Sequence, residues 1–156
     1  MTTQQKSTVF GSSEHFDENR IRAAAVYCSD GRFGEHFDDF LHNALELPRY
    51  DRLALPGGAA CLAGHFLSYK EEEGLIEQLR FLVKVHGIER LVLIAHQDCA
   101  FYTERLHVSP QQLEAQQRED MEAAVRRVRS LAHGLTVDAF FARKHSDGTI
   151  RFESMG

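Results

Sequence analysis

Short apolar segments alternate with amphipathic segments along this chain, and that alternation strongly constrains its fold. Residues 21–28 (IRAAAVYC) form a largely apolar run, and residues 35–45 follow with apolar side chains three and four positions apart. The same two patterns recur further along the chain, where an amphipathic segment at 72–86 precedes the apolar run ERLVLIAH at 89–96. Short apolar runs predict buried strands, and the three-to-four spacing predicts amphipathic helices. Strands that alternate with helices predict a mostly parallel sheet with helices on both faces.

Three further segments complete the predicted architecture. Residues 50–56 indicate a second short strand. Residues 109–133 indicate the longest helix, with Ser109 as its N-cap and Pro110 at its first position. Towards the end of the chain, two strand-like segments flank a turn at residues 146–148 (SDG), a pattern typical of a β-hairpin.

We therefore predict an α/β fold with a mostly parallel central sheet flanked by helices and an antiparallel hairpin at its C-terminal edge. Residues 21–156 would form this single domain. Residues 1–20 lack strong periodicity and are expected to form an N-terminal arm.

Composition narrows the class of protein. With 156 residues, 43% hydrophobic and 26% charged, the chain has the length and composition of one globular domain. No apolar run approaches the roughly 18–20 residues of a spanning helix, and the polar N-terminal segment lacks the apolar stretch of a signal peptide. We therefore expect a cytoplasmic protein with no membrane partner. The net charge of −5 argues against a nucleic-acid partner, and the basic residues 126–129 (RRVR) fit a solvated helix face.

Ionisable residues with metal-binding chemistry follow two of the predicted strands. Residues 28–32 (CSDGR) place Cys28, Asp30 and Arg32 directly after the first strand. Residues 96–99 (HQDC) place His96 and Cys99 at the end of the strand over 89–96. Parallel strands end at one edge of a sheet, where ligand sites of α/β proteins form. Two cysteines and a histidine would converge there, which is a zinc ligand set with one position left for water or a carboxylate.

Each of these residues also has an ordinary structural interpretation. A cysteine at the end of a buried strand often packs as a small apolar side chain, and Cys28 alone could do so. His96 alone could be a hydrogen-bonded histidine at a strand end, and Cys28 with Cys99 could form a redox pair without metal. The two motifs together favour a metal site. Cys61, which lies among glycines and alanines, is interpreted as core packing.

The two motifs resemble those of the β-class carbonic anhydrases. CSDGR is similar to their Cys-x-Asp-x-Arg motif and HQDC to their His-x-x-Cys motif, in the same order and each after a strand. The resemblance extends over most of the chain and suggests a divergent member of this family. It implies a Zn²⁺ ion bound by Cys28, His96 and Cys99, with Asp30 and Arg32 as the catalytic pair.

The resemblance also implies an activity and an assembly. The implied reaction is the reversible hydration of carbon dioxide to bicarbonate by a zinc-bound hydroxide, so the protein would be a zinc lyase with a small-molecule substrate. Asp30 would orient the hydroxide while Arg32 keeps Asp30 ionised and in place; in a closed state, Asp30 would itself bind the zinc. The implied assembly is a homodimer or homotetramer in which the N-terminal arm wraps a partner.

Residues 55–60 depart from the family's pattern. The family has an Arg-Asn-Ala-Gly stretch after the second strand, where this chain has LPGGAA from Leu55 to Ala60. Loss of the Arg and Asn side chains changes the polarity of the cleft, so the departure bears on the substrate more than on the metal. Two alternatives stay open: hydrolysis of carbon disulfide or carbonyl sulfide on the same fold, and a non-catalytic zinc-binding dimer that acts as an interaction protein.

Overall fold

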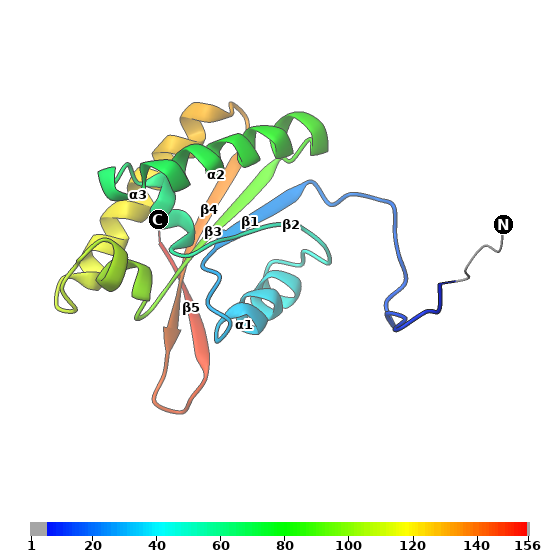
Figure 1. The fold of residues 1–156 in the computed structure, drawn as a ribbon, viewed down its shortest axis with the longest axis horizontal. Coiled ribbons are helices and arrows are strands. Elements are labelled where there is room, and N and C mark those ends of the chain that lie inside the picture. The colour runs from blue at the N-terminus through cyan, green and yellow to red at the C-terminus, as the bar shows by residue number, and fades with distance from the viewer. Residues whose placement is uncertain (1–5, 156) are drawn as a thin grey trace.

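A five-stranded sheet in the order β2-β1-β3-β4-β5 forms the centre of the fold (Figure 1). The structure is a computed structural model that describes residues 6–155. The strands are β1 (Ala23–Tyr27), β2 (Asp51–Ala54), β3 (Arg90–His96), β4 (Thr136–Lys144) and β5 (Ile150–Ser154), and the α-helices are α1 (Gly34–Asp39), α2 (Tyr69–Phe81) and α3 (Leu113–Leu131). Strands β1 to β4 run parallel to one another, and β5 runs antiparallel to β4. The predicted α/β fold with its antiparallel C-terminal hairpin is confirmed.

Shorter helical segments extend or connect these helices. The π-helical segments are η1 (Phe40–Ala44), η4 (Leu82–His86) and η5 (Phe101–Arg105), and the 3-10 segments are η2 (Gly58–Leu62) and η3 (Phe66–Ser68). The segments η1 and η4 directly continue α1 and α2, so the helices predicted over 35–45 and 72–86 are each confirmed as an α-helix that ends in a π-helical turn. Gly87 follows η4 with a φ of +66°, a conformation in which glycine commonly ends a helix.

Helices cover both faces of the sheet, and the strand sequences explain why. Successive side chains of a strand point to opposite faces. Along β1, Ala24 and Val26 pack in the core formed with α2 and α3, whereas Ala25 and Tyr27 pack in the core formed with α1. Every residue of β1 is buried. A strand between two helical layers must therefore be apolar throughout, as the run at 21–28 predicted.

The prediction that a helix starts at Ser109 and Pro110 is wrong. Ser109 and Pro110 belong to a turn, which the N–H of Gln112 closes by donating to the carbonyl of Ser109 at 3.0 Å. The helix α3 begins at Leu113 and ends at Leu131, and its first turn has no side-chain cap. Leu113 is buried, so the helix starts where its apolar face meets the core. The backbone bond of the turn took the place of the expected Ser109 cap.

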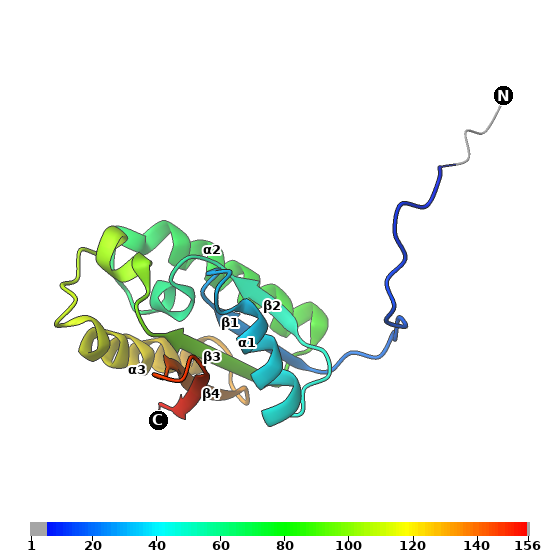
Figure 2. The ribbon, with the colours of Figure 1, turned by 90° about the horizontal axis from the view of Figure 1, so that it is seen from below.

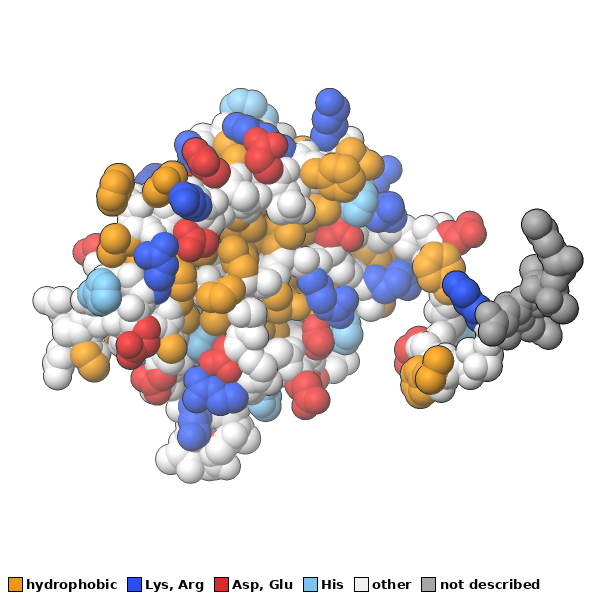
Figure 3. All heavy atoms as spheres, in the orientation of Figure 1, with side chains coloured by type: hydrophobic (Ala, Val, Ile, Leu, Met, Phe, Trp, Pro, Cys, Tyr) orange, Lys and Arg blue, Asp and Glu red, His pale blue; other side chains and the backbone are white. Residues whose placement is uncertain are grey.

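The N-terminal segment lies apart from the sheet. Residues 6–20 contain no helix or strand and are exposed. Arg49 contacts Asp17 and Asn19, and the part of the segment before this contact runs away from the rest of the chain (Figure 2). Val9, Phe10 and Phe16 are among the exposed large apolar side chains. Charged side chains of both signs are interspersed over the face in Figure 3. Within residues 6–155, no helix has the length and apolar character that crossing a membrane requires.

Candidate metal centre

The sheet brings the two sequence motifs to one edge. Strands β1 and β3 are adjacent and parallel, with Tyr27 opposite Ile94. Cys28 directly follows β1, and His96 is the last residue of β3. The chain then turns at Asp98, which has a φ of +56°, and so returns Cys99 towards the end of β1. Short polar residues such as aspartate tolerate this left-handed conformation better than most.

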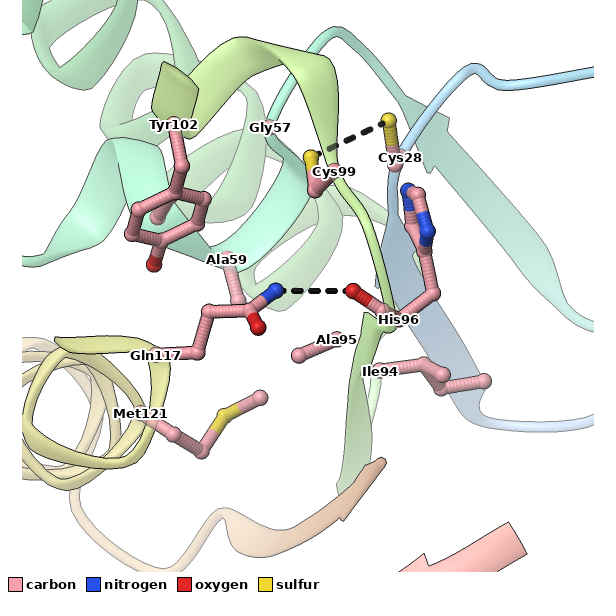
Figure 4. Close-up of a pocket in the computed structure, with 11 residues that line it drawn as sticks. Cys28, Gly57, Ala59, Ile94, Ala95, His96, Cys99, Tyr102, Gln117 and Met121 are labelled. Atoms are coloured by element: carbon pink, nitrogen blue, oxygen red, sulfur yellow. Dashed lines mark hydrogen bonds between the residues drawn. The ribbon is translucent and has the colours of Figure 1, made fainter. Parts of the chain in front are cut away.

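The three expected metal ligands converge in this structure. One ligand atom each of Cys28, His96 and Cys99 lies within 4.8 Å of the other two. The two Sγ atoms are 4.0 Å apart (Figure 4). Two sulfurs at about 2.3 Å from a tetrahedral zinc ion are roughly 3.8 Å apart, so the observed separation is close to that of a zinc site. All three residues are buried, with His96 only 1% exposed.

The orientation of His96 also fits a metal ion. Its Nδ1 lies 2.8 Å from the carbonyl oxygen of Gln97, so Nδ1–H can donate there and leave Nε2 as an acceptor. Buried Nε2 has no hydrogen-bond partner among the residues described. The ring of Phe33 packs against the imidazole, with ring centroids 4.3 Å apart. A metal ligand needs this tautomer and this free nitrogen, so the donor set fits zinc.

The acid–base properties of the two thiols point the same way. The Cys99 thiol donates a hydrogen bond to Cys28, and this bond is the main cause that lowers the pKa of Cys28 to about 4. The backbone N–H groups of Gly57 and Asp30 lower the pKa of Cys28 further. The hydrogen bond to Cys28 and burial raise the pKa of Cys99. One thiolate forms readily, but a second buried negative charge beside it needs a cation.

Asp30 and Arg32 form a close ion pair beside the cluster. Arg32 Nε donates to both carboxylate oxygens of Asp30 at 3.1 and 3.2 Å, and Arg32 Nη2 donates to Oδ2 at 2.7 Å. The backbone N–H of Arg32 adds a bond of 2.9 Å to Oδ1. These contacts, led by the side-chain bonds of Arg32, lower the pKa of Asp30 to about 2. Asp30 is not part of the three-residue cluster in this structure.

Cys61 lies outside the cluster of the three expected ligands. It is fully buried in the core with α2 and α3, and its Sγ lies 3.4 Å from the carbonyl oxygen of Pro56. Burial raises the pKa of Cys61 to about 12, so the thiol keeps its proton at neutral pH. Its interpretation as core packing agrees with this position.

The sequence analysis missed Gln117, which reaches from α3 to the cluster of expected ligands Cys28, His96 and Cys99. Its Nε2 donates to the backbone carbonyl of His96 at 2.7 Å (Figure 4). Gln117 lines a cavity of about 10 Å³ together with the three expected ligands and Met121. A signal was available in the sequence, because Gln117 occupies a position in the buried stripe of α3 between Leu113 and Met121. A polar residue in an apolar stripe marks a specific hydrogen bond.

Comparisons with known proteins agree with the fold and with the motifs. A family model described as "Putative carbonic anhydrase" matches residues 18–150. The chain is similar to the crystal structure of β-carbonic anhydrase isoform I from the protozoan Trichomonas vaginalis, with 14% identity, a TM-score of 0.57, and coverage of 92% of this chain and 89% of that chain. It also matches a β-carbonic anhydrase of the fungus Aspergillus fumigatus, with 17% identity, a TM-score of 0.45, and coverage of 86% of this chain and 76% of that chain. No curated protein matches the chain.

The family match covers most of the chain and includes both motifs, at residues 28–32 and 96–99. The likeness to the Trichomonas enzyme, at low identity but nearly full coverage, shows a shared fold. The chain therefore belongs to the putative carbonic anhydrase family, as a divergent member with the β-carbonic anhydrase fold.

Proposed function

We propose that this protein is a zinc-dependent carbonic anhydrase that hydrates carbon dioxide reversibly to bicarbonate. The observation that carries the proposal is the convergence of Cys28, His96 and Cys99 beside the Asp30–Arg32 ion pair. The family and the fold support a lyase of the carbonic anhydrase type. The finer assignment of substrate, metal and residue roles is the proposal.

Cys28, His96 and Cys99 would hold the zinc ion through two thiolates and the free Nε2. When bound, zinc acts as a Lewis acid that lowers the pKa of a coordinated water towards neutrality. Two thiolates offset the charge of the ion, so the acidifying effect is weaker than with three neutral histidines. We therefore expect activity to rise from neutral to alkaline pH.

Asp30 would orient the attacking group, and Arg32 would fix Asp30. An ionised carboxylate accepts hydrogen bonds and cannot donate them. Asp30 held by Arg32 can therefore accept a hydrogen bond from the attacking hydroxyl and direct its lone pair at the carbon of the substrate. The pairing with Arg32 supports an open site, since in a closed site the same carboxylate would bind the metal instead.

A cavity beside the ion pair offers space for a small substrate. It has a volume of about 220 Å³ and is lined by Arg32, Phe33, Gln97, Asp98, Lys144 and Ile150. Arg32 belongs to the ion pair, and Phe33 packs on His96, so the cavity borders both parts of the proposed site. Phe33 and Ile150 give this mixed lining an apolar part that suits carbon dioxide, and the basic side chains of Arg32 and Lys144 suit the bicarbonate product.

Assembly and location also belong to the proposal. A homodimer or homotetramer is supported by the arm, whose apolar side chains Val9, Phe10 and Phe16 are 98%, 84% and 90% exposed. A cytoplasmic location is supported by the three cysteines of the chain, none of which forms a disulfide bond.

A second candidate substrate class is carbonyl sulfide or carbon disulfide. The observation that favours it is the apolar character of the segment after β2, where Gly57, Ala59 and Ala60 line the cavity against the ligand cluster. Sulfur analogues of carbon dioxide are less polar and would suit such walls better than a hydrogen-bonding cleft.

The proposal is tested by stopped-flow carbon dioxide hydration at pH 7 and pH 9, with protein whose zinc content has been measured. We expect one zinc per chain, enzyme-like turnover and a higher rate at pH 9. Asp30→Asn should keep its zinc and lose roughly a hundredfold or more in kcat/KM, because general acid–base and orienting groups contribute on the order of 10²–10⁴. Glu122→Gln, an equal change of charge at an exposed position of α3, is the matched control and should behave as wild type.

Different results would point to different errors. Zinc-loaded wild type that turns over carbonyl sulfide but not carbon dioxide would favour the second substrate class. Zinc-loaded protein inactive on both would favour the non-catalytic alternative. Wild-type activity in Asp30→Asn would overturn the role of Asp30.

A further inference from the structure

Gln117 has surroundings that are unusual for a glutamine. It lies on the buried face of α3 and is 2% exposed. Its side chain points from α3 towards the end of β3, with Ala95 and Met121 nearby (Figure 4). In such a position an apolar side chain would pack without any polar group to satisfy.

One end of the Gln117 amide makes a short hydrogen bond to the backbone of His96, one of the three expected ligands. Nε2 donates to the carbonyl of His96 at 2.7 Å. The next residue, Gln97, is held by the sheet, because its N–H donates to the carbonyl of Ala142 at 3.0 Å and its Oε1 accepts from the N–H of Lys144 at 2.9 Å. The backbone around His96 is therefore fixed from two sides, by β4 and by α3.

The other end of the same amide is unsatisfied. Oε1 of Gln117 is buried and has no hydrogen-bond partner among residues 6–155. The neighbouring buried Asp120 differs, because Gln116 Nε2 lies 2.9 Å from its Oδ1 and His65 Nε2 lies 2.7 Å from its Oδ2. A buried acceptor without a partner destabilises a fold. The amide satisfies the buried carbonyl of His96 but leaves its own Oε1 without a partner, so its net contribution to stability is small, which indicates a role other than stability.

We propose that Gln117 is a positioning residue for the metal ligand His96; this inference rests on the metal site of the proposed function. By holding the carbonyl of His96, Gln117 fixes the backbone from which the imidazole projects. The bond between Nδ1 and Gln97 then sets the ring so that Nε2 faces the sulfurs of Cys28 and Cys99. Groups that orient metal ligands in this way raise metal affinity.

The test separates positioning from stability with the variant Gln117→Met, which keeps the length of the side chain and removes both polar atoms. Zinc affinity is measured by competition with a chromophoric chelator, and thermal unfolding is measured on metal-free protein. We expect zinc affinity to fall about 10- to 100-fold, while the Tm of the metal-free protein changes little, because removal of the unpartnered Oε1 offsets the loss of the bond to the carbonyl of His96. A purely structural residue would show the opposite pattern. Gln117→Leu, which likewise has no group that could donate to the carbonyl of His96, is a second variant with the same expected loss of affinity.

Gln116→Met is the matched control. Gln116 is the preceding residue of α3, and its amide donates to Asp120 instead of His96. This variant should keep the zinc affinity of wild type, whatever it does to Tm. Equal zinc affinity in wild type and both Gln117 variants would overturn the inference alone, and so would an equal loss in the Gln116 and Gln117 variants. A wild-type protein that binds no zinc would overturn the proposed function, and this inference with it.

Discussion

Gly58 brings the segment after β2 against the end of β1. Its φ is +51°, and a Cβ at this position would lie 2.6 Å from the carbonyl carbon of Tyr27 and 2.7 Å from the nitrogen of Cys28. Both are backbone atoms, so neither can move aside without moving the first expected ligand. The glycines in LPGGAA thus permit a close approach of two backbones as well as changing the polarity of the cleft.

The variant Gly58→Ala should destabilise the protein by about 1–3 kcal/mol, because the left-handed φ and the steric clash both penalise a Cβ there. Urea unfolding monitored by circular dichroism measures the effect. Gly74→Ala is the control: Gly74 is an exposed residue of α2, and a methyl group added there would meet no atom within 4 Å outside its own helix backbone and chain neighbours. This change should stabilise the helix by about 0.5–1 kcal/mol. Equal midpoints for the two variants would contradict the argument.

Single residues also show what the sequence can predict of the site. The convergence of Cys28, His96 and Cys99 was predictable because each lies at the end of a strand or in the turn that follows it, and parallel strands end together. Gln117 was not predicted, because its bond to the carbonyl of His96 depends on where α3 crosses the sheet. The spacing of residues along a helix does not contain that information.

At the scale of elements, an ion-pair network joins α3 to the C-terminal hairpin. Arg143 on β4 donates from Nε to Glu153 on β5 at 2.7 Å and from Nη1 to Glu114 on α3 at 3.2 Å. The guanidinium of Arg143 also lies over the ring of Phe141 at 4.9 Å. These contacts tie the antiparallel edge of the sheet to the helix that carries Gln117.

The network should make stability depend on pH. Arg143 holds the pKa of Glu114 and of Glu153 below the ordinary value of 4.5. A lowered pKa in the folded state stabilises the fold above the ordinary pKa, and this stabilisation is lost as the pH falls through the lowered pKa. The loss of Tm in Arg143→Met should therefore be largest near pH 7 and shrink below about pH 4.5. Both carboxylates are over two-fifths exposed, so each ion pair contributes about 1 kcal/mol or less to the free energy of unfolding. For a chain of this size, a loss of about 1 kcal/mol lowers Tm by roughly 2–4 °C.

Arg151→Met is the control for this experiment, because Arg151 on β5 is exposed and, among the residues that the structure describes, pairs at 3.3 Å only with Asp147 of the adjoining hairpin turn. It should change Tm little at either pH. A Tm difference between Arg143→Met and wild type that stays the same from pH 7 to pH 4 would show that packing on Phe141, and not the ion pairs, accounts for the role of Arg143.

Elements differ in how well the sequence predicts them. The strands at 21–28 and 89–96 and the closing hairpin were predicted because their apolar pattern and turn residues are local signals. The start of α3 was wrong because two local signals competed, and a backbone bond within the turn at residues 109–112 replaced the Ser109 cap. The choice between them depends on the burial of Leu113, which is a property of the whole fold.

At the scale of the whole molecule, the order of the strands makes the site. Because β1 lies between β2 and β3, it ends beside both the glycine-containing segment after β2 and the HQDC turn after β3. No local pattern specifies this order, although a predicted parallel sheet made the convergence a reasonable expectation. Cys28 and Cys99 join segments far apart in the chain, so a metal ion between them would link the two halves of the sheet.

Under the proposed function, removal of zinc should therefore lower the stability of the whole sheet. Zinc at a thousandfold excess over its dissociation constant stabilises a folded protein that binds it by about 4 kcal/mol. For a chain of this size, that corresponds to a Tm shift of roughly 8–16 °C. Differential scanning calorimetry with zinc and with a chelator measures the shift. In Cys99→Ser the shift should be largely lost, because one of the two thiolates is gone.

Cys61→Ala is the matched cysteine control for this shift. Cys61 is fully buried but lies outside the cluster of expected ligands Cys28, His96 and Cys99. Its substitution should lower Tm both with zinc and with chelator, while the difference between the two conditions stays that of wild type. A full zinc shift in Cys99→Ser would rule out Cys99 as a ligand. A zinc shift that Cys61→Ala loses as completely as Cys99→Ser would mean that zinc acts through the general packing of the core, not through a site at the edge of the sheet.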